Sequence, residues 1–156
     1  MRTVKTVLFV VLAVLVTASL GMAATMSFKA KLTGKEEVPA VMTKGGGEAI
    51  FKLSKDGKEL TYEVKVKGLE NITASHIHAG KKGEEGAPVV GLFGGPKKEG
   101  KFSGVLAKGT IMDKDLVGSL AGKTVSDLVA MIKDGGAYVN VHTAKVPSGE
   151  IRGQIK

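Results

Sequence analysis

Apolar and polar residues alternate along most of this chain. In 28–34 (FKAKLTG) the two kinds follow one another, and the same period of two recurs in 48–54 and in 60–68. Such alternation is typical of antiparallel strands that turn one face to the core and the other to water. Further strand-like runs occupy 72–78, 88–92, 102–111, 137–142 and 150–155. The pattern predicts an all-β fold of about eight short strands, arranged as a sandwich or barrel.

Turn-forming residues separate these runs. They gather in KGGGE, KDGKE, KKGEEGAP, GGPKKEG and PSGE, as expected of loops. Asp56-Gly57 stands between two alternating runs and predicts a tight hairpin. The glycine-rich KGGGEA and GLFGGP lack the Lys-Ser/Thr of a phosphate-binding loop and the spacing of a dinucleotide-binding turn, so they too predict turns.

One segment, 124–136, has a helical period instead. Its apolar residues Leu128, Val129, Met131 and Ile132 recur at helical spacing. Thr124 or Ser126 can cap its start, and Gly135-Gly136 can end it. We expect one short helix across one end of the β structure.

The first residues differ from everything that follows. A positive head with Arg2 and Lys5 precedes an unbroken apolar run, 7–16, and Gly21-Met22-Ala23 places small residues before a cleavage point. This is the layout of a secretory signal peptide. The apolar run is about half the roughly 20 residues of a membrane-spanning helix, although retention as an uncleaved anchor stays open. We expect a signal peptide at 1–23, a single domain at 24–156, and export to the periplasm or the extracellular space, with no membrane attachment after cleavage.

Composition narrows the function classes. The chain has no Cys, so its fold must rest on a hydrophobic core, and no thiolate is available as a metal ligand or nucleophile. The formal charge of +8, or +6 without Arg2 and Lys5, is spread largely over strand lysines, where it favours solubility and protects sheet edges. With no Trp and few Tyr or Phe, the stacking surfaces of nucleic-acid-binding proteins are missing. We therefore expect no nucleic-acid partner.

The three histidines of the chain all lie in strand-like segments. His76 and His78 in ASHIHAG are two residues apart and share one face of a strand, and His142 in AYVNVHT shares a face with Tyr138 and Asn140. If the two strands are neighbours, the three imidazoles converge. Imidazole suits Zn(II) and Cu(II), and three protein ligands leave one coordination position open. The same residues can instead form a hydrogen-bonded structural cluster without metal.

Three more polar residues accompany the histidines. Asn140 lies on the His142 face of its strand, and Glu150 and Arg152 share a face in GEIRGQI. Glu150 and Arg152 can pair with each other, or, like Asn140, hydrogen-bond to ligating histidines. The sequence has no Ser in a nucleophile elbow and no recognisable carboxylate pair, so we expect no catalytic residue. A one-metal hydrolytic or redox centre at the histidines is the enzymatic alternative.

LTGKEEVPAV, ASHIHAGKKGEEGAPVV and AYVNVHTAKVPSGEIRGQI, in this order and spacing, resemble the CHRD domain, a family named after chordin and found in many secreted bacterial proteins. The resemblance covers about 26–155, with Ala40 where the family usually has a second Pro. It implies an immunoglobulin-like β-sandwich or Greek-key barrel. It transfers no catalytic role, and the animal relative acts by binding a growth factor.

Two hypotheses follow for function. In the first, the exported domain is a non-enzymatic carrier or binding module that coordinates Cu(II) or Zn(II) through His76, His78 and His142. In the second, it is an envelope or extracellular interaction domain with a protein partner, and the histidines only brace the sheet.

Overall fold

Seven strands and one α-helix make up the part of the chain that the computed structural model describes, residues 25–156. The strands are β1 (Ser27–Thr33), β2 (Gly46–Leu53), β3 (Leu60–Ala79), β4 (Pro88–Phe93), β5 (Lys98–Ile111), β6 (Ala137–Thr143) and β7 (Ile151–Gln154). The helix is α1 (Val125–Lys133), and short 3₁₀ turns lie at Gly34–Glu36, Asp113–Asp115 and Gly118–Leu120. The predicted signal peptide, 1–23, lies outside the described residues.

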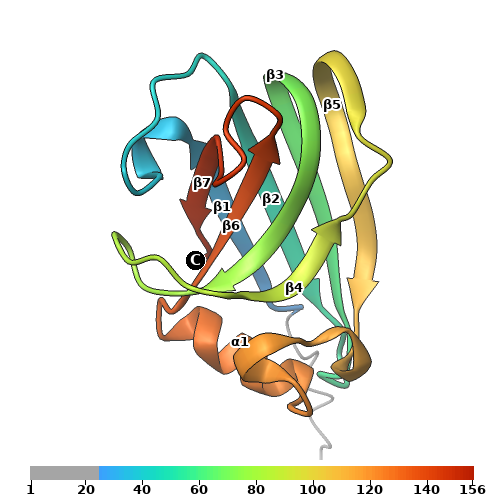
Figure 1. The fold of residues 1–156 in the computed structure, drawn as a ribbon. Helices are drawn as coiled ribbons and strands as arrows, with labels where there is room; N and C mark the ends of the chain where they lie inside the picture. Colours follow the sequence, from blue (N-terminus) through green and yellow to red (C-terminus); the bar gives the residue numbers. More distant parts are fainter. Residues whose placement is uncertain (1–24) are drawn as a thin grey trace, which may run out of the picture.

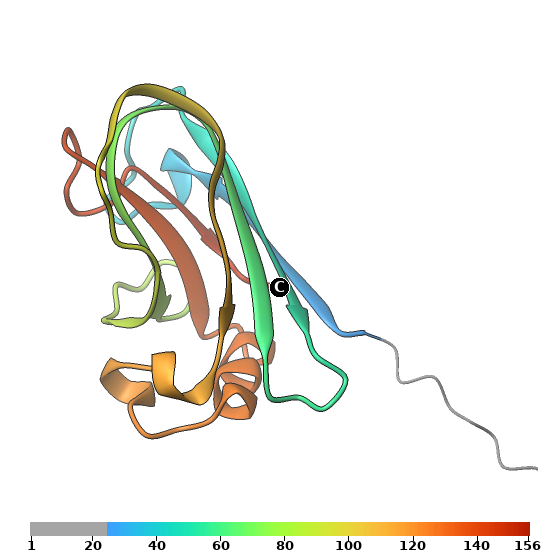
Figure 2. The ribbon, with the colours of Figure 1, turned by 90° about the vertical axis from the view of Figure 1, so that its right-hand side faces the viewer.

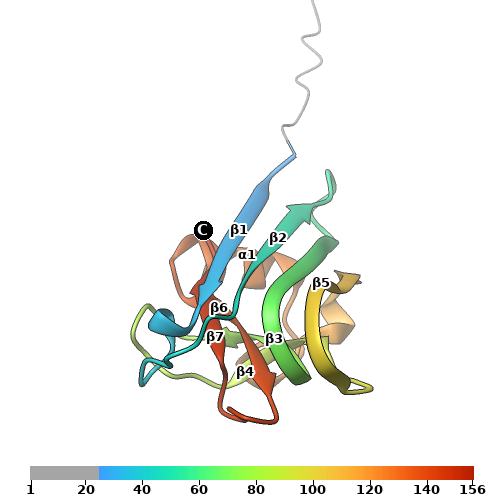
Figure 3. The ribbon, with the colours of Figure 1, turned by 90° about the horizontal axis from the view of Figure 1, so that it is seen from above.

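Five of the strands close into a barrel. The hydrogen-bonded order is β2-β1-β7-β6-β3, and β3 pairs back onto β2 (Figure 3). β4 and β5 also pair with β3, so they extend the sheet beyond the closed ring. The predicted all-β class is confirmed, and every strand pairing in the sheet is antiparallel. The immunoglobulin-like Greek-key arrangement is not confirmed.

A single bent strand explains why the expected count of about eight strands was wrong. The predicted strands 60–68 and 72–78 are the two halves of β3, which has 20 residues. Gly68 and Asn71 have φ values of 65° and 54°, and the pairing with β5 shifts register on both sides of Leu69. These bulges bend the strand instead of ending it. In Figure 2 the strand β3, drawn in green, runs upward, bends at the top of the molecule and runs back down on another side of the barrel. Its first half pairs with β2, and its second half pairs with β4 and β6.

The apolar residues of the alternating pattern turn inward and fill the barrel interior. In β1, Phe28, Ala30 and Leu32 are buried while the residues between them are exposed. Apolar side chains from the other strands and from α1 join the same core, including the fully buried Phe51 and Ile77. Burying such side chains stabilises the fold by about 1.5–3 kcal/mol each. The fold depends on this burial because the chain has no Cys and therefore no disulfides.

The predicted helix and hairpin are both confirmed. Thr124 caps α1 by accepting a hydrogen bond from the Asp127 N–H, and Asp127 accepts one from the Thr124 N–H in return. The helix covers one end of the barrel together with the 3₁₀ turns at Asp113–Asp115 and Gly118–Leu120 (Figure 1). Asp56-Gly57 forms the turn between β2 and β3, where Leu53 pairs with Leu60. Within residues 25–156, no helix has the length and apolar character needed to cross a membrane.

Candidate metal centre

The three histidines come together on the outer face of two neighbouring strands. β3 and β6 pair so that His76 lies opposite Asn140, His78 opposite Tyr138, and His142 opposite Ala74. Because partners in such a ladder turn their side chains to the same face, the opposite face is left to apolar residues such as Ile77 and Val139, which are fully buried. The predicted convergence of the imidazoles is confirmed, and we call His76, His78 and His142 the histidine cluster.

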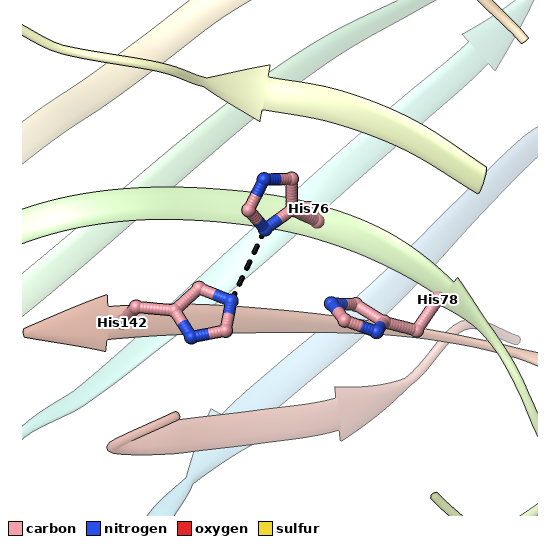
Figure 4. A group of neighbouring side chains, drawn as sticks. All are labelled: His76, His78 and His142. Atoms are coloured by element: carbon pink, nitrogen blue, oxygen red, sulfur yellow. Dashed lines mark hydrogen bonds between the residues drawn. The ribbon is translucent and has the colours of Figure 1, made fainter. Parts of the chain in front are cut away.

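The ring nitrogens of the histidine cluster are close enough to share one ion. One nitrogen from each ring lies within 4.8 Å of the others. His76 Nδ1 and His142 Nε2 are 3.1 Å apart, as the dashed line in Figure 4 marks. Two ligands on a tetrahedral ion at about 2.0–2.1 Å are separated by about 3.3 Å. This pair therefore has a separation suited to either a hydrogen bond or two ligands of one metal ion.

Hydrogen bonds to main-chain carbonyls fix the orientation of two rings. His78 Nδ1 lies 2.8 Å from the Gly86 oxygen, and His142 Nδ1 lies 2.8 Å from the Pro147 oxygen. A carbonyl only accepts, so each Nδ1 carries the proton and each Nε2 carries a lone pair. His78 Nε2 is buried and makes no hydrogen bond, although the Asn140 side chain lies next to the ring, whose pKa is lowered by burial and raised by Asn140. Protein metal sites orient their histidines in this way, with one nitrogen held by a carbonyl and the other free to ligate.

The surroundings keep the rings uncharged. Burial, with the nearby His142 and His78, lowers the pKa of His76 from 6.5 to about 4. Burial also lowers the pKa values of His78 and His142, more than their carbonyl hydrogen bonds raise them. Only neutral imidazole binds metal ions, so at neutral pH all three rings have the charge state that ligation requires. Ligation through His76 Nδ1 also requires its proton to move from Nδ1, where it bonds His142, to Nε2.

A family comparison connects this geometry with the sequence motifs. The family model of the CHRD domain matches residues 28–155. The chain belongs to the CHRD-domain family. The matched region contains the whole histidine cluster and the strands that carry it. No curated protein and no solved structure matches the chain.

Arg152 supports the histidine cluster of this CHRD domain from the next strand. Its guanidinium carbon lies 3.4 Å from the centre of the Tyr138 ring, and that ring stacks on His78 with centroids 5.1 Å apart. Arg152 is 2% exposed and donates a hydrogen bond to the Lys81 oxygen at 3.1 Å. The loop 80–87, between β3 and β4, is thus held by Arg152 at Lys81 and by His78 at Gly86.

Glu150 has a different position from the two that the sequence suggested. It forms no ion pair with Arg152 in the described part of the chain. Its carboxylate instead accepts hydrogen bonds from Thr43 at 2.7 Å and from Thr143 at 2.6 Å. Glu150 therefore fastens the loop before β2 to the end of β6, next to His142 in sequence.

Asn140 and Glu37 bring two more unsatisfied acceptors into the CHRD domain. Asn140 Oδ1 and Glu37 Oε1 are both buried without a hydrogen-bond partner. A Cβ placed on Gly149 would lie 2.7 Å from Glu37 Oε1 and 2.7 Å from Asn140 Nδ2, so the two side chains approach each other at this glycine. Burial raises the pKa of Glu37 from 4.5 to about 7, although the Arg152 charge lowers it.

The sequence suggests an edge or turn location for Glu37, which precedes Pro39, and gives no sign that its side chain is buried. Nothing in the alternation distinguishes it from the half-buried Glu36 next to it, because the loop folds back through contacts that are distant in sequence. Its position inside the EEVPAV motif was the available indication.

Proposed function

We propose that this CHRD domain is an exported, non-enzymatic binding module that coordinates Cu(II) or Zn(II) through His76, His78 and His142. The observation that carries the proposal is His78 Nε2, a buried lone pair without a partner beside two other imidazoles. Leaving such a group unsatisfied costs about 1–3 kcal/mol. A metal ion bound to it removes that cost.

The donor set favours these two ions over others. Three neutral imidazoles suit Zn(II) and Cu(II), whereas Mg²⁺ and Ca²⁺ prefer oxygen ligands. The ligating atoms would be His76 Nδ1, His78 Nε2 and His142 Nε2, and a fourth position stays open. Asn140 and Arg152 would hold the ligating rings in position. Asn140 lies opposite His76 on the neighbouring strand, and Arg152 packs on the Tyr138 ring. Glu150 would hold the border of the site.

A signal peptide at 1–23 and a single domain at 24–156 would place the protein in the periplasm or outside the cell. A binding role is favoured over catalysis because the sequence has no Ser in a nucleophile elbow and no recognisable carboxylate pair. The partners would be the metal ion and an envelope or extracellular protein.

Metal titration tests the proposal. Tag-free protein, produced from the full 156-residue chain, is titrated with Zn(II) and Cu(II) by calorimetry, beside a His76→Ala/His78→Ala/His142→Ala variant whose fold is checked by circular dichroism. We expect one site in the parent and none in the variant. Because the pKa of His76 lies at about 4, affinity should persist at pH 6 and fall towards pH 4. Equal, weak binding by both proteins would refute the proposal.

A protein-interaction domain with purely structural histidines is the second candidate. The observation that favours it is the direct contact of 3.1 Å between His76 and His142, which is a good hydrogen bond without metal. In that case a pull-down from envelope extracts should recover a specific partner, and its binding should survive a chelator. Failure to recover a partner across several growth conditions would count against this candidate.

A further inference from the structure

A basic cavity of about 450 Å³ lies on the outer face of the barrel, apart from the histidine cluster. Its lining consists of four lysines and three other polar residues, Lys29, Lys31, Thr33, Glu36, Lys82, Gln154 and Lys156. A volume of this size is within the range of small-molecule sites. We call these seven residues the basic cavity.

Two strands and a loop bring the lysines together. Lys29 and Lys31 alternate with core residues of β1, so both turn outward and their positions along the strand are about 7 Å apart. Lys156 follows β7 and exchanges two main-chain hydrogen bonds with Lys29, at 2.8 and 2.9 Å. Lys82 reaches the cavity from the loop 80–87. The cationic groups therefore come from three segments that are far apart in the sequence.

The wall of the cavity is fixed by hydrogen bonds. The Gln154 amide nitrogen donates to the Gly80 oxygen at 2.8 Å and to the Gly135 oxygen at 2.7 Å. These bonds tie β7 to the loop 80–87 and to the end of α1. A wall that is already ordered needs little rearrangement to accept a ligand, which lowers the entropic cost of binding.

Charge in the cavity is strongly unbalanced. Its only side-chain carboxylate, Glu36, pairs with Lys82 at 3.3 Å. Over residues 25–156, Lys29, Lys31 and Lys156 form no ion pair. Another cavity is better balanced, because Glu63 lines it together with two lysines, Lys52 and Lys108, and pairs with Lys108. Several like charges around one concave surface repel each other and attract anions.

We propose that the basic cavity binds a small anion that carries at least two phosphate or carboxylate groups. The spacing of Lys29 and Lys31 suits two anionic groups of one ligand. Lys82 and Lys156 add positive charge on other sides of the same cavity. The lining contains no Arg. Lysine acts as a point charge and lacks the planar, two-pronged geometry of arginine. The cavity should therefore rank ligands by charge and size more than by the shape of the anionic group.

Calorimetric titration of metal-free protein with inorganic tripolyphosphate and with citrate tests the proposal and distinguishes phosphate from carboxylate ligands. We expect saturable binding at one site, weaker in high salt. Lys29→Gln/Lys31→Gln should weaken binding at least about tenfold, since charge-assisted hydrogen bonds are lost. The control is Lys65→Gln/Lys67→Gln, which removes the same charge at the same strand spacing outside the cavity, although Lys65 is paired with Glu63 at 2.6 Å. This control should change affinity less than about twofold.

Two results would overturn the proposal. One is the absence of saturable binding to both anions, and the other is an equal loss of affinity in the two double variants, which would indicate diffuse attraction to the whole basic surface. The variant without the three histidines should bind the anions like the parent. This arm keeps the basic cavity separate from the metal proposal, because either can fail alone.

Discussion

Glu37 is buried and His76 is half-buried, and the fold disfavours the charged form of each. The pKa of Glu37 is raised from 4.5 to about 7, chiefly by burial, and the pKa of His76 is lowered from 6.5 to about 4, again chiefly by burial. Replacing Glu37→Gln removes one titration and leaves the other. The pH dependence of the free energy of unfolding then shows what each group contributes.

The two groups affect stability in opposite directions over the same pH range. The folded chain keeps the Glu37 proton up to about pH 7 whereas the unfolded chain releases it near 4.5, so this group lowers stability as pH rises. The unfolded chain binds a proton at His76 near pH 6.5 whereas the folded chain binds it only near 4, so this group raises stability as pH rises. For a fully buried group each effect would reach about 3.5 kcal/mol, because one pKa unit corresponds to about 1.4 kcal/mol. Solvent screening makes the effect smaller, most of all at the half-buried His76.

Denaturant unfolding of metal-free protein between pH 4.5 and 7.5 measures the effect. Far-ultraviolet circular dichroism is the suitable probe because the chain has no Trp. Over this range Glu37→Gln should gain up to about 3 kcal/mol more stability than the parent does. The matched control, Glu36→Gln, removes a partly exposed carboxylate paired with Lys82 and should follow the parent. Parallel pH curves for Glu37→Gln and the parent would refute the reasoning.

Three further substitutions, one of them with a control, test contacts near the histidine cluster and the cap of α1 by the same unfolding measurement. Gly86→Ala should cost at least about 2 kcal/mol, because its Cβ would lie 1.4 Å from the Ala79 oxygen, whereas Gly94→Ala, with open space around it, should stay within about 0.5 kcal/mol. Glu150→Gln should lower the free energy of unfolding by about 1–3 kcal/mol, because two threonine hydroxyls lose a charged acceptor. A cost below about 0.5 kcal/mol, which is typical of ordinary surface substitutions, would contradict that bonding. Thr124→Ala should cost about 1 kcal/mol through the lost helix cap, and an unchanged midpoint would contradict the capping.

Local patterns predicted the elements of this fold well. Period-two alternation located β1, β2 and the first half of β3, strand-like runs located the remaining described strands, and Thr124 with Gly135 bounded the helix. The strand count was wrong because Gly68 and Asn71 resemble a turn in sequence, yet both adopt positive φ inside one continuous strand. Closure into a barrel depends on which distant strands pair, and alternation carries no information about that choice.

The site was predictable to the extent that it follows from strand geometry. The two-residue spacing of His76 and His78 fixes their common face, and the pairing of β3 with β6 adds His142. The partners of Glu150 depend on Thr43, in a loop 107 residues away along the chain. The burial of Glu37 depends on a loop in the same way, and neither contact leaves a periodic trace in the sequence.

The most direct test of the central claim is a crystal structure of the protein loaded with Zn(II) or Cu(II), with the ion located by its anomalous scattering. The account predicts one ion about 2.0–2.1 Å from His76 Nδ1, His78 Nε2 and His142 Nε2, with the carbonyl contacts of His78 and His142 retained. An ion bound elsewhere, with the hydrogen bond between His76 and His142 intact, would contradict it.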